Sequence, residues 1–260
     1  MHITNHALLN NDKIRKLYLQ SAASQWSADE KLDFTNPIQI EPEARQVWTD
    51  LATVFYTLEK MGLGVLTEMF TKASKKYESE ETLLYLTMQC ADEGRHVYAV
   101  EQYLTKLGKK PTYEWKYHVL GQVSSLGFFR VENWLFSTLF SENFASSFLR
   151  RAKTSHIDPL GAEMCRRILV DESRHLHFLH IALPDIMARM SGLGKAYVKM
   201  SQYFIMKFTE TVTKTIEDQA KIVGIDRRDL LEEVFENIEK AYEGFGVSRE
   251  FLYFPKISVN

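Results

Sequence analysis

The sequence predicts an all-α protein whose core is a four-helix bundle, with additional helices before and after it. Hydrophobic residues recur with a helical period nearly throughout the 260 residues, and we find no alternation typical of strands. The pattern Asp-Glu-x-Arg-His occurs twice, at residues 92–96 and 171–175, each time within a helical pattern. This offset of roughly eighty residues indicates two helical hairpins related by a pseudo-twofold axis.

Helix-end signals define the individual segments. The expected helices cover residues 12–24, 42–75, 79–108, 112–153, 158–183, 193–223 and 226–244. Asp158 and Pro159 supply an N-cap and a proline at the first helical position, and Pro184 is expected to end that helix. Residues 25–37 and the tail from 248 are expected to be irregular. No linker divides the chain, so we expect one domain over residues 1–260, with a bundle core at about 41–184 and flanking helices in 1–40 and 185–260.

Composition excludes several classes of function. With 45% hydrophobic and 25% charged residues the chain is typical of a soluble globular protein. A net charge of −2 gives no electrostatic reason to expect nucleic acid or an anionic membrane as a partner. There is no signal-peptide layout and no apolar run near the ~20 residues of a membrane span, so a cytoplasmic location is expected. Cys90 and Cys165 do not form a C-x-x-C motif, which disfavours a rubredoxin-type iron centre, a zinc ribbon and a disulfide framework.

The repeated motif predicts metal binding. Glu93 and His96, like Glu172 and His175, are three residues apart and therefore project from one face of a helix toward the same ion. A single Glu-x-x-His pair decides little, because roughly 0.7 such pairs are expected by chance in this composition. Two copies that share the preceding Asp and the internal Arg are much harder to obtain by accident.

Two further glutamates should complete the set of ligands, one from each remaining helix of the bundle. In the first hairpin, Glu59 lies at nearly the same depth from the turn as Glu93, with a mismatch of about 3 Å, whereas Glu68 is about 10 Å away in depth. In the second hairpin, Glu142 matches the depth of Glu172 better than Glu132 does, by about 9 Å. We therefore predict Glu59 and Glu142 as ligands, with Glu132 either supporting the ligands from behind or lining the pocket.

The donor set predicts the metal and the reaction. The expected metal ligands are Glu59, Glu93, His96, Glu142, Glu172 and His175. Carboxylate oxygens and neutral imidazoles suit two iron ions, with Mn/Fe as the alternative, and four negative charges balance two divalent cations. Carboxylates that shift between binding modes can open positions for dioxygen, so O2 activation is the expected chemistry.

Residues beside the ligands are expected to support them. Asp92 and Asp171 are expected to hold the ligand histidines through their second ring nitrogens, and Arg95 and Arg174 to neutralise these aspartates. Thr138 and Ser146 lie one turn on either side of Glu142. Their hydroxyls are the candidate catalytic groups, as hydrogen-bond partners of a small ligand at the centre.

These residues match the E…E-x-x-H…E…E-x-x-H pattern of the ferritin-like, ribonucleotide-reductase-like di-iron carboxylate superfamily, which the chain resembles over about residues 41–184. Within it, Val100 stands where reductase small subunits carry a radical tyrosine. Met61 and Ser137 stand at the Val–Tyr crosslink of the ligand-binding oxidases. Ile168 replaces the additional ligand histidine of aminobenzoate N-oxygenases. Ferritins are much shorter, and rubrerythrins need cysteines that the chain lacks.

The resemblance implies an oxygenase or oxidase similar to the hydroxylase and N-oxygenase branches. It would act on a small, largely apolar or aromatic molecule with O2, take electrons from a separate reductase or ferredoxin, and have a homodimer as its candidate assembly. Two alternatives stay open. One is a ferroxidase-type iron-binding protein, and the other is a radical-generating subunit with Tyr56, Tyr98 or Tyr103 as the radical site.

Overall fold

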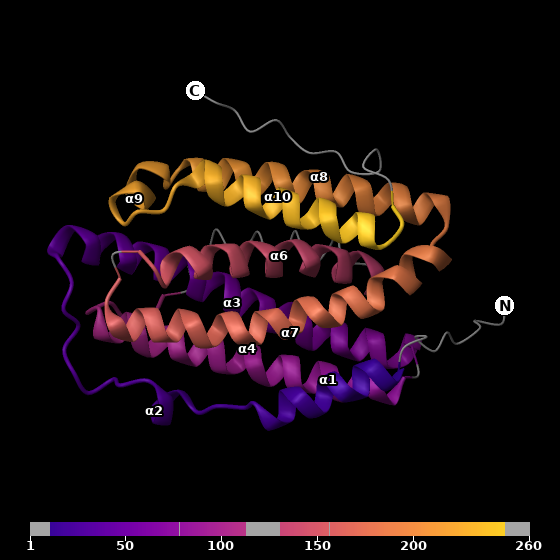
Figure 1. The fold of residues 1–260 in the computed structure, drawn as a ribbon, viewed down its shortest axis with the longest axis horizontal. Helices are drawn as coiled ribbons and strands as arrows, with labels where there is room; N and C mark the ends of the chain where they lie inside the picture. The colour runs from indigo at the N-terminus through magenta and orange to yellow at the C-terminus, as the bar shows by residue number, and fades with distance from the viewer. Residues whose placement is uncertain (1–10, 78, 113–130, 156, 248–260) are drawn as a thin grey trace. The chain divides into compact units, whose positions relative to one another are not determined.

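A computed structural model describes residues 11–77, 79–112, 131–155 and 157–247, and within them every regular element is a helix (Figure 1). The helices are α1 (Asn11–Ala23), α2 (Ala28–Lys31), α3 (Pro42–Tyr77), α4 (Glu80–Lys106), α6 (Val131–Ala152), α7 (Pro159–Arg189), α8 (Gly192–Lys214), α9 (Glu217–Ile222) and α10 (Arg227–Gly244). The predicted all-α fold is confirmed for these residues. Among them, no helix is long and apolar enough to cross a membrane.

The chain divides into two compact units, one of residues 1–38 and 49–131 and the other of residues 39–48 and 132–260. The first unit holds α1, α2, most of α3, and α4. The second holds the first turns of α3 together with α6 to α10. Each copy of the repeated motif therefore belongs to a different unit. The prediction of a single domain stays a prediction.

In the first unit, α1 packs along α4. Ile14 and Leu17 of α1 are almost completely buried, as are Tyr85 and Leu104 of α4. Ser79 caps the start of helix α4, and its hydroxyl accepts the backbone N–H of Thr82 at 3.3 Å. These contacts fix the rotation of α4 and thus the direction of its motif residues.

In the second unit, α7 begins as the sequence predicts. The carboxylate of Asp158 accepts the backbone N–H groups of Leu160 and Gly161 at 3.0 and 3.1 Å, and Pro159 occupies the first turn. The capped start sets the register of the whole helix, including its Glu-x-x-His motif.

The predicted end of that helix is wrong, because α7 continues through Pro184 to Arg189. Proline removes one backbone donor and strains the preceding turn. Leu183, Ile186 and Met187, on both sides of it, are at most 6% exposed. Burial stabilises the helix by about 1.5–3 kcal/mol for each of these side chains, which offsets the cost of the proline.

Two other segments differ from expectation. A helix was predicted over 193–223, but α8 ends at Lys214 and α9 starts at Glu217. β-Branched residues crowd this stretch, and the hydroxyl of Thr215 bonds to the Val212 carbonyl at 2.7 Å, which competes with helical hydrogen bonding. The short α2 lies within the segment expected to be irregular. Residues 113–130 of the predicted 112–153 helix, and the aromatic tail from 248, lie outside the described residues.

Candidate metal centre

In the first unit, α3 and α4 bring Glu59, Glu93 and His96 together. Their potential ligand atoms all lie within 4.8 Å of one another, and the Nδ1 atom of His96 is 3.4 Å from Oε2 of Glu59. All three side chains are buried, and His96 is fully so. The competing glutamate of the same helix, Glu68, is 53% exposed and pairs with Lys72 at 2.7 Å. Of the two glutamates on α3, Glu59 is therefore the one that lies beside Glu93 and His96, as its depth in the hairpin predicts.

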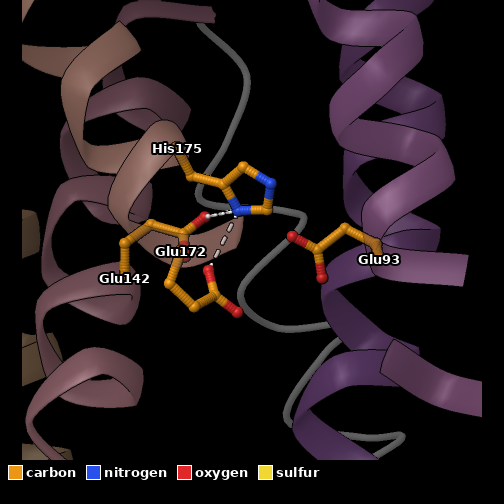
Figure 2. A group of neighbouring side chains, drawn as sticks. All are labelled: Glu93, Glu142, Glu172 and His175. Carbon is orange, nitrogen blue, oxygen red and sulfur yellow. Dashed lines mark hydrogen bonds and ion pairs between the residues drawn. The ribbon is translucent and has the colours of Figure 1, made fainter. Parts of the chain in front are cut away.

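In the second unit, α6 and α7 bring Glu142, Glu172 and His175 together (Figure 2). The Nδ1 atom of His175 lies 2.9 Å from Oε2 of Glu172 and 3.4 Å from Oε1 of Glu142. These three residues are at most 6% exposed. Glu132, the competing glutamate on α6, is only half-buried and does not belong to this group. The two units thus carry the same local arrangement of two carboxylates and one imidazole.

The electrostatics of the second cluster favour a bound cation. Burial, and next the neighbouring Glu142 carboxyl, raise the pKa of Glu172 to about 8, while His175 acts in the opposite direction. Two carboxyl groups held together without water cannot both ionise cheaply unless a proton or a metal ion compensates them. A divalent cation supplies this compensation directly. The donor set, with oxygen and imidazole nitrogen and no thiolate, fits iron or manganese.

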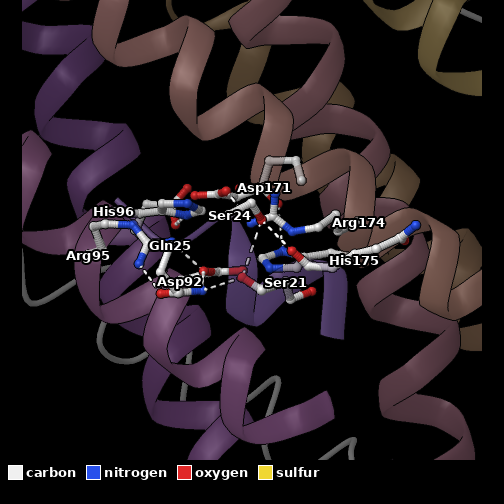
Figure 3. Close-up of polar contacts among 12 residues, drawn as sticks. Ser21, Ser24, Gln25, Asp92, Arg95, His96, Asp171, Arg174 and His175 are labelled. Atoms are coloured by element: carbon white, nitrogen blue, oxygen red, sulfur yellow. Dashed lines mark hydrogen bonds and ion pairs between the residues drawn. The ribbon is translucent and has the colours of Figure 1, made fainter. Parts of the chain in front are cut away.

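Each motif also contains an ion pair next to its ligands (Figure 3). Arg95 pairs with Asp92, and Arg174 pairs with Asp171, in both cases three residues apart on one helix. The aspartate side chains are at most 2% exposed and the arginine side chains 10–11% exposed. The predicted neutralisation of the aspartates is confirmed. The predicted hydrogen bonds from these aspartates to the ligand histidines stay a prediction.

The two predicted hydroxyl groups differ in their surroundings. The hydroxyl of Thr138 donates to the carbonyl oxygen of Trp134 at 3.0 Å, one turn earlier on α6. The side chain of Ser146 is 4% exposed, and its hydroxyl has no hydrogen-bond partner among the described residues. Ser146 lies one turn after Glu142, about 40° around the helix from it. Of the two hydroxyls, only that of Ser146 is uncommitted.

Two residues that the sequence pattern does not indicate, Gln25 and Trp26, also contact the first motif. The side-chain amide of Gln25 donates to Oδ1 of Asp92 at 2.9 Å, and the ring of Trp26 lies 5.0 Å from the Arg95 guanidinium carbon. The segment was expected to be irregular, which is correct for these two residues. Nothing in its local pattern indicates a partner so distant in sequence.

Comparisons with known proteins support the fold and assign the family. Solved structures similar to this chain include an R2-like ligand-binding oxidase with aerobically reconstituted metal cofactor after photoconversion, with a TM-score of 0.71, 15% identity, and coverage of 91% of this chain and 93% of that one. Another is Protein 19 with aldehyde deformylating oxidase activity from Synechococcus, with a TM-score of 0.65, 18% identity, and coverage of 84% and 95%. These likenesses confirm the predicted ferritin-like helical fold.

No curated protein matches the sequence significantly. The family model described as "P-aminobenzoate N-oxygenase AurF" matches residues 45–242, which include both motifs and all six predicted ligands. Since the match covers most of the sequence, the chain belongs to the p-aminobenzoate N-oxygenase AurF family.

Proposed function

We propose that this protein is an O2-activating, non-haem di-iron oxidoreductase. The observation that carries the proposal is the repetition, in each unit, of a buried group of two glutamates and one histidine. The proposed ligands are Glu59, Glu93, His96, Glu142, Glu172 and His175. One divalent ion neutralises the two carboxylates of each group, so a pair of ions balances all four. Two irons are proposed, with Mn/Fe as the alternative, since similar solved structures are described with a Mn/Fe cofactor.

The proposed substrate is a small, largely apolar or aromatic molecule, and the proposed reaction is hydroxylation or N-oxygenation. The family description names an aromatic amine, p-aminobenzoate, which supports this class. The chain departs from the aminobenzoate N-oxygenase pattern at Ile168, which is fully buried at the place of the additional histidine. We therefore propose a centre with two histidine ligands rather than three.

The residues around the proposed centre would have separate roles in the reaction. When bound, the metal ions would supply the electrons that reduce dioxygen. Asp92 and Asp171, held by their arginines, would keep the imidazoles oriented for coordination. Ser146 would donate its uncommitted hydroxyl proton in a hydrogen bond to a small ligand at the centre, while the Thr138 hydroxyl remains bound to the Trp134 carbonyl.

A separate reductase or ferredoxin, a cytoplasmic location and a homodimer are further parts of the proposal. The test begins with anaerobic Fe(II) loading and elemental analysis, with about two ions per chain expected. The loaded protein is then exposed to 18O2 with a chemical reductant and a panel of aryl amines and arenes. Mass spectrometry should detect one labelled oxygen atom in an organic product.

Other outcomes identify the alternatives. Oxidation of Fe(II) without any organic product would contradict the proposal and favour a ferroxidase. A tyrosyl radical signal in electron paramagnetic resonance would favour a radical-generating subunit. The buried Tyr56 and Tyr103 are better sheltered for that role than Tyr98, which is 39% exposed. Metal content of zero or one ion would contradict the dinuclear centre itself.

A further inference from the structure

Side chains of residues 11–31, here called the N-terminal strap, form an ion pair and hydrogen bonds with α4 at three positions along that helix. Near the start of α4, Arg15 pairs with Glu81 at 3.4 Å. At the motif, the Gln25 amide donates to Asp92 at 2.9 Å. Two residues beyond the motif, the hydroxyl of Tyr98 donates to Asp29 at 2.8 Å. The middle attachment is the one that touches residues inside the Asp-Glu-x-Arg-His motif.

Gln25 bridges both members of the buried ion pair (Figure 3). Its Nε2 atom donates to Oδ1 of Asp92, and its Oε1 atom accepts from Nη1 of Arg95 at 2.5 Å. A neutral amide can do both, because it carries a donor and an acceptor and adds no charge. Gln25 Nε2 also donates to the Ser21 carbonyl at 3.2 Å, which ties the amide to the end of α1. Trp26 then covers the guanidinium with its ring.

We infer that Gln25 is a positioning residue for the metal-binding turn of α4, acting through the Asp92–Arg95 ion pair. The inference rests on the proposed function, because the turn that it fixes carries Glu93 and His96. Asp92 and His96 are four residues apart and share one face of α4. A carboxylate held by two partners in one orientation limits the motion of that turn and keeps the ligands preorganised. Supporting contacts of this kind change metal affinity about 10–100-fold when they are removed.

The informative substitution is Gln25→Glu, which preserves the size of the side chain but replaces the donor to Asp92 with a second carboxylate. It should weaken binding of the ion at Glu59, Glu93 and His96 about tenfold. The affinity for the second ion, at the glutamates and histidine of α6 and α7, should stay unchanged. The measurement is an anaerobic titration with Co(II), monitored by calorimetry and by the ligand-field spectrum of the bound ion. The spectrum reports the coordination geometry without any turnover.

Two companion variants separate positioning from simple loss of stability. Asp29→Ala removes an attachment of the same strap outside the motif, so its Co(II) affinity and spectrum should equal those of the wild type. The double variant Gln25→Glu/Asp92→Asn exchanges the amide and the carboxylate, and it retains both the total charge and the hydrogen bond in reverse polarity. Because Asp92→Asn by itself breaks the ion pair with Arg95, the double variant should bind Co(II) less tightly than the wild type, but its loss of affinity should be smaller than the sum of the losses in the two single variants.

The results overturn the inference if Gln25→Glu binds Co(II) like Asp29→Ala, or if the double variant shows only the added losses of two single changes. A wild-type protein without metal affinity would overturn both the inference and the proposed centre. A wild-type protein that binds two ions but oxidises no substrate would contradict only the proposed reaction, since the effect of Gln25 is measured on binding.

Discussion

Oε1 of Glu142 lies 3.4 Å from Nδ1 of His175, although the two residues come from different helices, α6 and α7. This proximity arises because the two residues lie at similar distances along their helices from the connection between α6 and α7. It also distinguishes Glu142 from Glu132, which is more than two turns earlier on α6 and half-buried.

The first prediction tests this register. Glu142→Ala should lose most of the metal at one or both sites, because it removes a carboxylate from a buried group of three ligands. Glu132→Ala, the matched control on the same helix, should retain two ions per chain. Elemental analysis after anaerobic Fe(II) loading measures both. The opposite pattern of metal content would show that the ligand assignment on α6 is wrong.

A second prediction concerns the pH dependence of the metal-free protein. The pKa of Glu172 is raised to about 8, so the folded state retains a proton that the unfolded chain releases near its ordinary pKa of 4.5. This contribution to stability is complete below about pH 4.5 and is lost as the pH rises through about 8. The thermal midpoint of the apoprotein should therefore fall across this window.

The size of this effect is on the order of a few kcal/mol, from about 1.4 kcal/mol per unit of pKa shift. Glu172→Gln should flatten the pH profile, because the amide does not titrate. Bound metal should also flatten it, since the cation replaces the proton. A midpoint that rises between pH 5 and pH 8 in the apoprotein, relative to Glu172→Gln, would contradict the prediction.

A third prediction compares the two hydroxyls of α6. Ser146→Ala should reduce turnover while metal content and the thermal midpoint change little, because its buried hydroxyl has no hydrogen-bond partner in the part of the chain that the structure describes, and its removal costs the fold almost nothing. Ser146→Thr should restore part of the rate. Thr138→Ala should leave turnover near that of the wild type, because its hydroxyl is bound to Trp134. Equal losses in both alanine variants would argue against a specific role for Ser146.

The fourth prediction addresses the supply of electrons. The sequence contains no cysteine cluster for an iron–sulfur centre and no G-x-G-x-x-G nucleotide loop. Repeated turnover should therefore require a separate reductase, a ferredoxin or a chemical reductant. The measurement is NADH consumption by the metal-loaded protein without added flavin, for which no sustained oxidation is expected. Continuous consumption would place a reductase activity within this chain.

Local geometry alone determined much of the site. Glu and His three residues apart reach one ion on any helix, so both motifs could be interpreted without a structure. The start of α7 followed from Asp158 and Pro159, since capping depends on neighbours within one turn. Even the choice of Glu59 over Glu68 needed only the helical rise and an antiparallel hairpin.

Tertiary structure decided the features that depend on partners distant in sequence. Helix α7 passes through Pro184 because burial of neighbouring side chains outweighs the local preference to stop. Gln25 reaches Asp92 because α1 packs along α4, and the sequence around Gln25 carries no trace of this contact. Hydrogen bonding and ion pairing act between groups that the fold brings together, whereas helical periodicity and capping depend only on a few consecutive residues.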